Sequence, residues 1–135
     1  MNILVSACLL GINCRYDGKD NFNKKLYALK EKHNLIPVCP EVYGGMTTPR
    51  APSEIKGDNV ISKAGDDVTD YFKKGAEETL KLAKMFNCQA AILKEKSPSC
   101  GYGKIYDGTF TGITADLLTK NGISVIGESE IEKLL

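Results

Sequence analysis

Short apolar runs alternate with amphipathic helical segments along almost the whole chain. The runs are typical of buried strands, and they cover residues 3–5, 35–38, 90–93 and 124–126. Helices are expected between and after them, over residues 24–32, 67–86 and 114–120, with a terminal helix capped by Ser129. Strands that alternate with helices form parallel sheets with the helices packed on the faces. The order therefore predicts an α/β fold with three layers: a mainly parallel, Rossmann-like sheet with helices on both faces.

The segment over residues 67–86 has the clearest helical periodicity. Its apolar side chains recur every three or four residues and share one face, whereas lysines and glutamates cover the other: Phe72, Ala76, Leu80 and Ala83 are the apolar members. Asp67 precedes this segment and is the expected N-cap.

Residues 40–58 interrupt the alternation. Prolines at 40, 49 and 52 and the pair Gly44-Gly45 occur in this stretch, so we expect no regular helix there. Residues 60–61 are expected to form a minor edge strand. A long irregular segment in a small protein usually has a function.

Length and composition limit the classes of protein to consider. The chain has 135 residues, of which 42% are hydrophobic and 26% are charged, with 18 Lys and Arg against 17 Asp and Glu. These values fit one globular domain over residues 1–135. The near-neutral balance gives no electrostatic case for a specific nucleic-acid or membrane-surface partner. No apolar run is long enough for a membrane span and no secretory signal is visible, so we expect a cytoplasmic protein.

Five cysteines in so short a chain are unusual. Their odd number and the expected reducing compartment favour free thiols over a disulfide framework. Cys8 and Cys39 directly follow the first and second predicted strands, and Cys100 lies in the loop after the third. In open α/β sheets, ligands bind beyond the carboxyl ends of the strands. Three separate loops are therefore expected to bring three thiols to one edge of the sheet.

The chemistry of these thiols has three interpretations at this point. They form a soft-metal or iron–sulfur site, they are redox or nucleophilic cysteines, or they are buried small apolar side chains. A zinc site usually contains a Cys-x-x-Cys pair, which this sequence lacks, so dispersed cysteines fit a cluster better. Cys14 lies in the first loop and can join the group, whereas Cys88 is expected to be buried packing. The only histidine, His33, falls at a helix end and is not expected to be a ligand.

Polar residues follow the same strand ends. Glu41 lies two residues after Cys39, where a partly buried carboxylate can act in acid–base catalysis or can hold the loop as a hydrogen-bond acceptor. Ser97 and Ser99 precede Cys100, and they can bind a substrate oxygen or cap a tight turn.

Three charged residues complete the candidate site. Lys94 ends the third strand and either meets an anionic ligand or is solvated. Arg15 and Asp17 in the first loop form a bracing ion pair or contact a substrate. The glycine-rich stretches match no phosphate-binding loop.

Several sequence blocks resemble the bacterial thiouracil desulfurase family, which was formerly catalogued as a domain of unknown function. They occur in order and cover nearly the whole chain: Ser6–Gly11 with Asn13–Gly18, Pro37–Glu41 with Gly44-Gly45 and Pro49-Arg50, Leu93-Lys94 with Ser97–Gly101, and Ile105–Gly108.

The resemblance implies a 4Fe-4S cluster held by Cys8, Cys39 and Cys100, with one iron left open. It implies non-redox desulfuration of a small thiolated base, a pyrimidine such as 2-thiouracil, with release of sulfide. A soft thiocarbonyl sulfur suits an open iron, which acts as a Lewis acid.

The catalytic carboxylate and serine that the resemblance implies map to Glu41 and to Ser97 or Ser99. Lys94, Arg15 and Asp17 are then the candidates for substrate binding. Two other functions stay as alternatives: a cysteine-based redox or sulfur-transfer protein without a cluster, and a non-catalytic module that binds a small ligand or a cluster.

Overall fold

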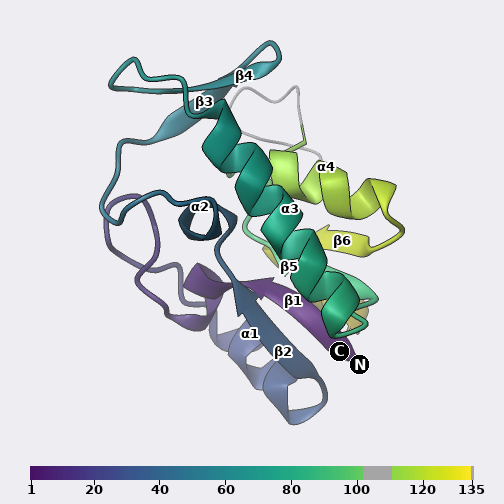
Figure 1. The fold of residues 1–135 in the computed structure, drawn as a ribbon. Coiled ribbons are helices and arrows are strands. Elements are labelled where there is room, and N and C mark those ends of the chain that lie inside the picture. Colours follow the sequence, from purple (N-terminus) through teal and green to yellow (C-terminus); the bar gives the residue numbers. More distant parts are fainter. Residues whose placement is uncertain (102–110, 135) are drawn as a thin grey trace.

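The computed structural model describes residues 1–101 and 111–134 (Figure 1). Its central sheet has four strands: β1 (Asn2–Ser6), β2 (Asn34–Val38), β5 (Ala90–Leu93) and β6 (Ser124–Gly127). The strand order is β2-β1-β5-β6, and every pairing is parallel. These strands coincide with the four apolar runs, so the parallel α/β sheet is confirmed.

Helices cover both faces of this sheet (Figure 1). One face carries α1 (Lys24–Ala28), the 3-10 helix η2 (Leu29–Glu31) and η3 (Glu128–Leu134). The other face carries α3 (Thr69–Met85) and α4 (Ile113–Lys120). The three-layer arrangement is therefore confirmed.

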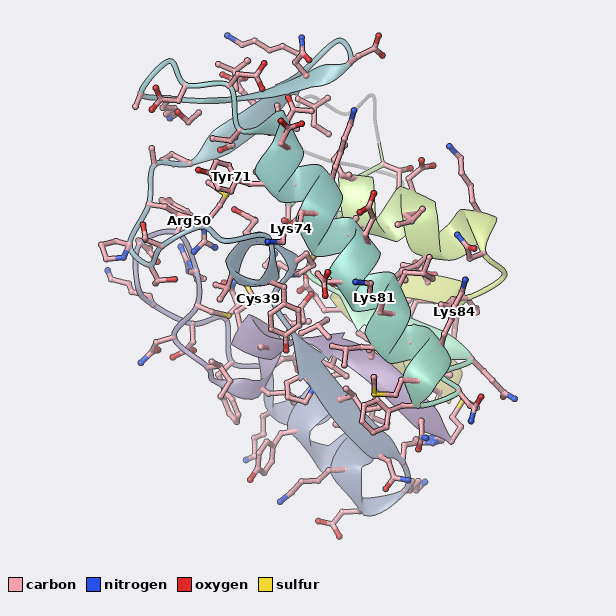
Figure 2. All side chains as sticks on the ribbon, in the orientation of Figure 1. Cys39, Arg50, Tyr71, Lys74, Lys81 and Lys84 are labelled. Atoms are coloured by element: carbon pink, nitrogen blue, oxygen red, sulfur yellow. The ribbon has the colours of Figure 1, made fainter. Side chains whose placement is uncertain are left out.

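Successive strand residues supply the two cores, because neighbouring side chains of a strand point to opposite faces. Ile3 and Val5 belong to the same buried cluster as Leu26 of α1. Leu4, which lies between them, belongs to the cluster of α4 with Leu118. On the outer side of α3, Lys74, Lys81 and Lys84 are exposed, as the periodicity predicted (Figure 2).

The segment after β2 is more regular than expected. A one-turn helix, α2 (Pro40–Tyr43), follows Cys39 directly. Pro40 is tolerated because it occupies the first turn, where its missing N–H has no partner to lose. The expectation of no regular helix in residues 40–58 is therefore wrong for this turn.

A small hairpin lies beyond α2. β3 (Ser53–Lys56) and β4 (Asn59–Ser62) pair antiparallel as a separate two-stranded sheet. Residues 60–61, expected to form a minor edge strand, are part of β4, and Val60 pairs with Ile55 of β3. The short connection between the two strands favours this local pairing over a distant one.

Two expected helix caps are wrong. At the start of α3 the N-cap residue is Val68, whose N–H donates to the Val60 carbonyl at 2.8 Å, and this bond ties the helix start to β4. Asp67 lies one position earlier and accepts from the Thr69 N–H at 3.0 Å. At the end of the chain, Ser129 lies inside η3, and its N–H donates to Glu95 Oε1 at 2.6 Å.

The backbones of α2 and α3 touch. A Cβ placed on Gly75 of α3 would lie 1.8 Å from the Pro40 carbonyl oxygen, and one on Gly44 would lie 2.0 Å from the Tyr71 carbonyl oxygen. Only glycine permits so close an approach. This contact sets the position of α2, and with it the position of Cys39 and Glu41.

The Ile105–Gly108 block of the family resemblance lies outside the described residues. Within residues 1–101 and 111–134, no helix is long and apolar enough to cross a membrane.

Candidate functional site

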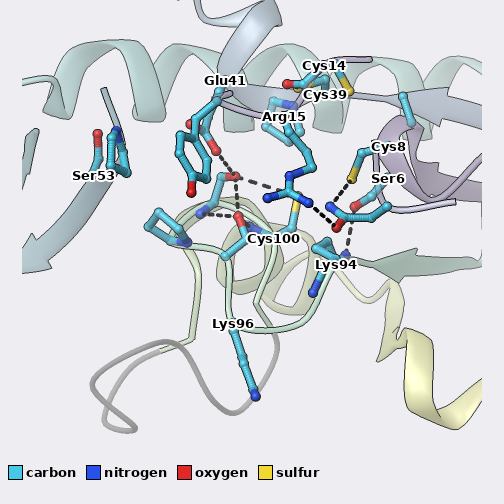
Figure 3. Close-up of a pocket in the computed structure, with 18 of the residues that line it drawn as sticks. Ser6, Cys8, Cys14, Arg15, Cys39, Glu41, Ser53, Lys94, Lys96 and Cys100 are labelled. Carbon is cyan, nitrogen blue, oxygen red and sulfur yellow. Dashed lines mark hydrogen bonds between the residues drawn. The ribbon is translucent and has the colours of Figure 1, made fainter. Parts of the chain in front are cut away.

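A pocket of about 610 Å³ opens at the carboxyl edge of the sheet (Figure 3). That volume falls in the range of small-molecule sites. Four of the five cysteines line it: Cys8, Cys14, Cys39 and Cys100. All of these thiols are free.

Three different strand ends deliver three of these thiols. Cys8 lies in η1 (Ala7–Leu10), the 3-10 turn that directly follows β1. Cys39 directly follows β2 and is the N-cap residue of α2. Cys100 lies in the loop after β5. The parallel strands end at the same edge, so the structure brings the three together as their positions in the sequence predicted.

Cys14 joins this group through hydrogen bonds to two of the other thiols. Its hydrogen bond is the largest cause that lowers the pKa of Cys8 to about 7, against the opposing effect of burial, and Asn21 adds to the lowering. The hydrogen bond with Cys14 likewise lowers the pKa of Cys39 to about 7. The same contacts raise the pKa of Cys14, which stays protonated as the donor.

Cys100 has the opposite character. Its residue is only 5% exposed, and burial raises the pKa of the thiol to about 12. Contacts with the hydroxyls of Ser6 and Ser99 oppose that effect but are smaller. In the metal-free protein Cys100 is therefore a neutral thiol at physiological pH.

Two residues fall outside this group, as expected. Cys88 is buried in the core cluster beneath α3 and α4. His33 is occupied elsewhere, since its Nε2 lies 3.1 Å from the Leu134 carbonyl oxygen and its Nδ1 lies 3.2 Å from the N-terminal amine.

The structure separates the two candidate serines. The Ser99 hydroxyl donates to Glu41 Oε2 at 3.0 Å, and Ser99 is only 1% exposed. Ser97 Oγ accepts from the backbone N–H groups of Ser99 and Cys100, both at 3.2 Å, and lies 3.0 Å from Ser99 Oγ. Ser97 therefore caps the turn, whereas Ser99 contacts the carboxylate directly.

Arg50 is a further residue of the site that the sequence did not single out. Its Nε lies 3.1 Å from Glu41 Oε1 in an ion pair whose side chains are 6% and 15% exposed. Its Nη2 donates to the Cys14 carbonyl oxygen at 2.9 Å. The only sequence signal for Arg50 was its place in one of the family-like blocks.

Arg15 and Asp17 form the bracing ion pair that was one of their two interpretations. Arg15 Nη2 lies 3.0 Å from Asp17 Oδ2, and Nη1 donates to Asn21 Oδ1 at 3.1 Å. Asn21 in turn donates to the Cys8 sulfur at 3.4 Å. Arg15 also lines the pocket, so the ion pair supports a residue at its wall (Figure 3).

Lys94 also lines the pocket and is paired. Its Nζ donates to Glu128 Oε1 at 3.1 Å and to the Glu95 carbonyl oxygen at 2.9 Å. Burial raises the pKa of Glu128, and the neighbouring Lys94 charge opposes that effect. The backbone N–H of Lys94 donates to Ser6 Oγ at 2.9 Å, and this bond ties the end of β5 to the end of β1.

The donor set fits an iron–sulfur cluster. In the part of the chain that the structure describes, no three His, Cys, Asp or Glu side chains are arranged to hold a single metal ion. Thiolates are the ligands that iron–sulfur clusters use, and three loops bring the cysteines Cys8, Cys39 and Cys100 to this one pocket.

Comparisons with known proteins agree with this site. The family model described as 2-thiouracil desulfurase matches residues 3–130. The chain is 43% identical to the uncharacterized protein YbbK of Bacillus subtilis (strain 168), over 98% of this chain and 99% of that protein. It is also similar to the solved structure of the 4Fe-4S-dependent thiouracil desulfidase TudS, with a TM-score of 0.91, 43% identity and coverage of 98% and 94% of the two chains. Because the family model spans nearly the whole sequence, this chain belongs to the 2-thiouracil desulfurase family.

Proposed function

We propose that this protein is a 4Fe-4S-dependent desulfidase that removes sulfur, as sulfide, from a small thiolated pyrimidine of the 2-thiouracil type. One observation carries the proposal: thiols from three strand ends meet the hydrogen-bonded Glu41–Ser99 pair in one pocket. The similar solved structure is named as a 4Fe-4S-dependent thiouracil desulfidase.

Cys8, Cys39 and Cys100 hold the cluster in this proposal. Three thiolates leave one iron of a 4Fe-4S cluster without a protein ligand, and this iron supplies a Lewis acid for the soft thiocarbonyl sulfur. The overall reaction exchanges C=S for C=O: water gives the oxygen, the C–S bond breaks, and sulfur leaves as sulfide with the two protons of that water. No electron is transferred in this balance.

Glu41 and Ser99 manage the protons. The carboxylate of Glu41 accepts a proton from the water that attacks the thiocarbonyl carbon. The Ser99 hydroxyl, 3.0 Å from Glu41 Oε2, relays protons between this carboxylate and the departing sulfur. Ser97 holds the turn that carries Ser99, so its effect on the reaction is indirect.

Arg15 and Lys94 both line the pocket. In our proposal, the N–H groups of these two side chains that are not used in their ion pairs donate hydrogen bonds to the polar edge of the base. Asp17 keeps Arg15 in place through the 3.0 Å ion pair.

We also propose that residues 1–135 form one domain that works in the cytoplasm. The family model covers residues 3–130, which supports one unit. Five free thiols suit a reducing compartment.

The test is sulfide release from 2-thiouracil by protein reconstituted without oxygen. Wild type is expected to release sulfide and uracil in equal amounts. Glu41→Gln and Ser99→Ala are expected to lower kcat by about 100-fold or more at unchanged iron content, because each removes a proton-handling group. Ser124→Ala, on the exposed end of β6, is the matched control with wild-type activity.

Loaded wild type that releases no sulfide contradicts the proposal. A metal-free thiol protein is then indicated if thiol titration of the cluster-free protein shows a reversible disulfide among the pocket cysteines. A ligand-binding module is indicated if 2-thiouracil raises the melting temperature without any turnover.

A further inference from the structure

Arg50 is a buried charged side chain whose guanidinium is surrounded by hydrogen-bond acceptors. Its side chain is 6% exposed. Its guanidinium faces four acceptors at hydrogen-bond distance: Glu41 Oε1 at 3.1 Å, the Cys14 carbonyl at 2.9 Å, the Thr47 carbonyl at 3.2 Å and Thr48 Oγ1 at 3.0 Å. A buried guanidinium keeps its charge, so these acceptors are required for its burial.

Two of these four acceptors, those of Cys14 and Glu41, belong to different segments that line the pocket and form two of its walls. The Cys14 carbonyl lies in the loop after β1, and the backbone N–H of Arg50 adds a second link to that loop through the Tyr16 carbonyl at 2.8 Å. Glu41 lies in α2 on the other wall. Arg50 therefore joins the loop to the carboxylate by hydrogen bonds from one planar group, which lysine cannot reproduce.

The two oxygens of Glu41 have different partners. Oε1 is paired with Arg50 Nε, and Oε2 accepts the hydroxyl of Ser99. A carboxylate with only one partner can rotate about its terminal torsion, which is broad. With Arg50 on one oxygen, the other stays directed at Ser99.

We propose that Arg50 is a positioning residue of the desulfurase site, which holds Glu41 in the orientation that the reaction needs. The role rests on the proposed function. It differs from simple wall support, because it acts through the Nε–Oε1 contact and not only through the bonds to backbone carbonyls. The two roles predict different results when Glu41 no longer has a carboxylate.

The test is a double-mutant cycle on the reconstituted holoenzyme with 2-thiouracil. Arg50→Met in the wild-type background is expected to lower kcat by about 10- to 100-fold with KM changed by less than about 2-fold, because misorientation affects the reacting geometry more than binding. In the Glu41→Gln background the same substitution is expected to lower kcat by less than about 2-fold. Arg50→Lys keeps a cation near Glu41 and is expected to retain more of kcat than Arg50→Met.

Two measurements without turnover accompany the cycle. Iron per chain is expected to match wild type in every variant that is compared. The unfolding free energy of the cluster-free proteins is expected to show coupling between positions 50 and 41. Lys25→Met is the control, since it removes an exposed ion pair with Glu132 and neither of these residues lines the pocket.

Equal fold-losses of kcat in both backgrounds would overturn the positioning role. If Arg50→Met fails to fold or to bind iron, Arg50→Lys carries the same cycle with the same expectation of non-additivity. Wild-type holoenzyme that releases no sulfide overturns the proposed function itself. Active wild type with additive losses overturns only the role of Arg50.

Discussion

Cys14 has the largest influence on the pKa of its two neighbouring thiols, Cys8 and Cys39. Its hydrogen bonds are the largest cause that lowers the pKa of Cys8 and of Cys39, each to about 7. Cys100, in contrast, has a pKa raised by burial to about 12. The pocket of the cluster-free protein therefore contains two thiols that ionise near neutrality, Cys8 and Cys39, and two that stay protonated, Cys14 and Cys100. Thiolates are the form that binds metal and reacts with electrophiles.

This difference predicts the order of alkylation in the reduced, cluster-free protein. Iodoacetamide is expected to modify Cys39 and Cys8 first, with a rate that is half-maximal near pH 7, because their pKa is about 7. Cys14→Ala removes the donor, so both midpoints are expected to rise toward the unshifted cysteine pKa of 9.0. Peptide mapping by mass spectrometry against pH measures both. A wild-type midpoint near that ordinary value for Cys39 would contradict the account.

The buried thiol of Cys100 predicts a loss of stability in alkali. Its pKa is raised from 9.0 to about 12 by burial, so unfolding frees a group that ionises more readily in the unfolded chain. The stabilisation is complete below the unfolded pKa and is lost as pH rises through the interval up to about 12. At about pH 10 the expected loss is roughly 1.4 kcal/mol. Urea unfolding of the cluster-free protein measures it, and Cys100→Ala should flatten the dependence. An equally steep curve in that variant would refute the assignment.

At the scale of elements, the contact between α2 and α3 positions Cys39 and Glu41 in the site. α2 begins just after Cys39 and carries Glu41. It rests on the backbone of α3 at Gly44 and Gly75, where a Cβ would lie 2.0 and 1.8 Å from carbonyl oxygens. The positions of Cys39 and Glu41 therefore depend on α3, a helix that contributes no residue to the pocket lining.

Gly75→Ala tests this dependence through the sign of the change in the unfolding free energy. In an ordinary helix interior, Gly→Ala raises stability by about 1 kcal/mol. Here the new Cβ meets backbone, so α2 must move, and we expect a loss of about 2 kcal/mol or more in the unfolding free energy together with reduced iron binding. Denaturant unfolding measures the change. Glu77→Ala, on the exposed side of the same helix, is the control, expected to stay within about 0.5 kcal/mol. A more stable Gly75→Ala protein would show that the two helices are not in the contact described.

At the scale of the whole molecule, much of the architecture was predictable because buried parallel strands are contiguous apolar runs. The same runs placed Cys8, Cys39 and Cys100 at one edge, since parallel strands end together. The one-turn helix α2 was missed because four residues are too few to show a helical period.

Contacts between distant segments were the part that the sequence could not predict. Ser97 and Ser99 are equivalent in sequence, and only the fold shows which hydroxyl reaches Glu41, 58 residues away. Arg50 was missed for the same reason, because its link to the Cys14 carbonyl spans 36 residues. Asp67 has the residue type of an N-cap, but the bond from Val68 to β4 moved the helix start beyond it.

The central claim is that Cys8, Cys39 and Cys100 bind a cluster and that the other two cysteines do not. Iron and acid-labile sulfide per chain, measured after anaerobic reconstitution of the five single Cys→Ser variants, test it most directly. We expect about four irons per chain in wild type, Cys14→Ser and Cys88→Ser. We expect little or none in Cys8→Ser, Cys39→Ser and Cys100→Ser. Full iron in Cys100→Ser, or negligible iron in wild type, would contradict the account.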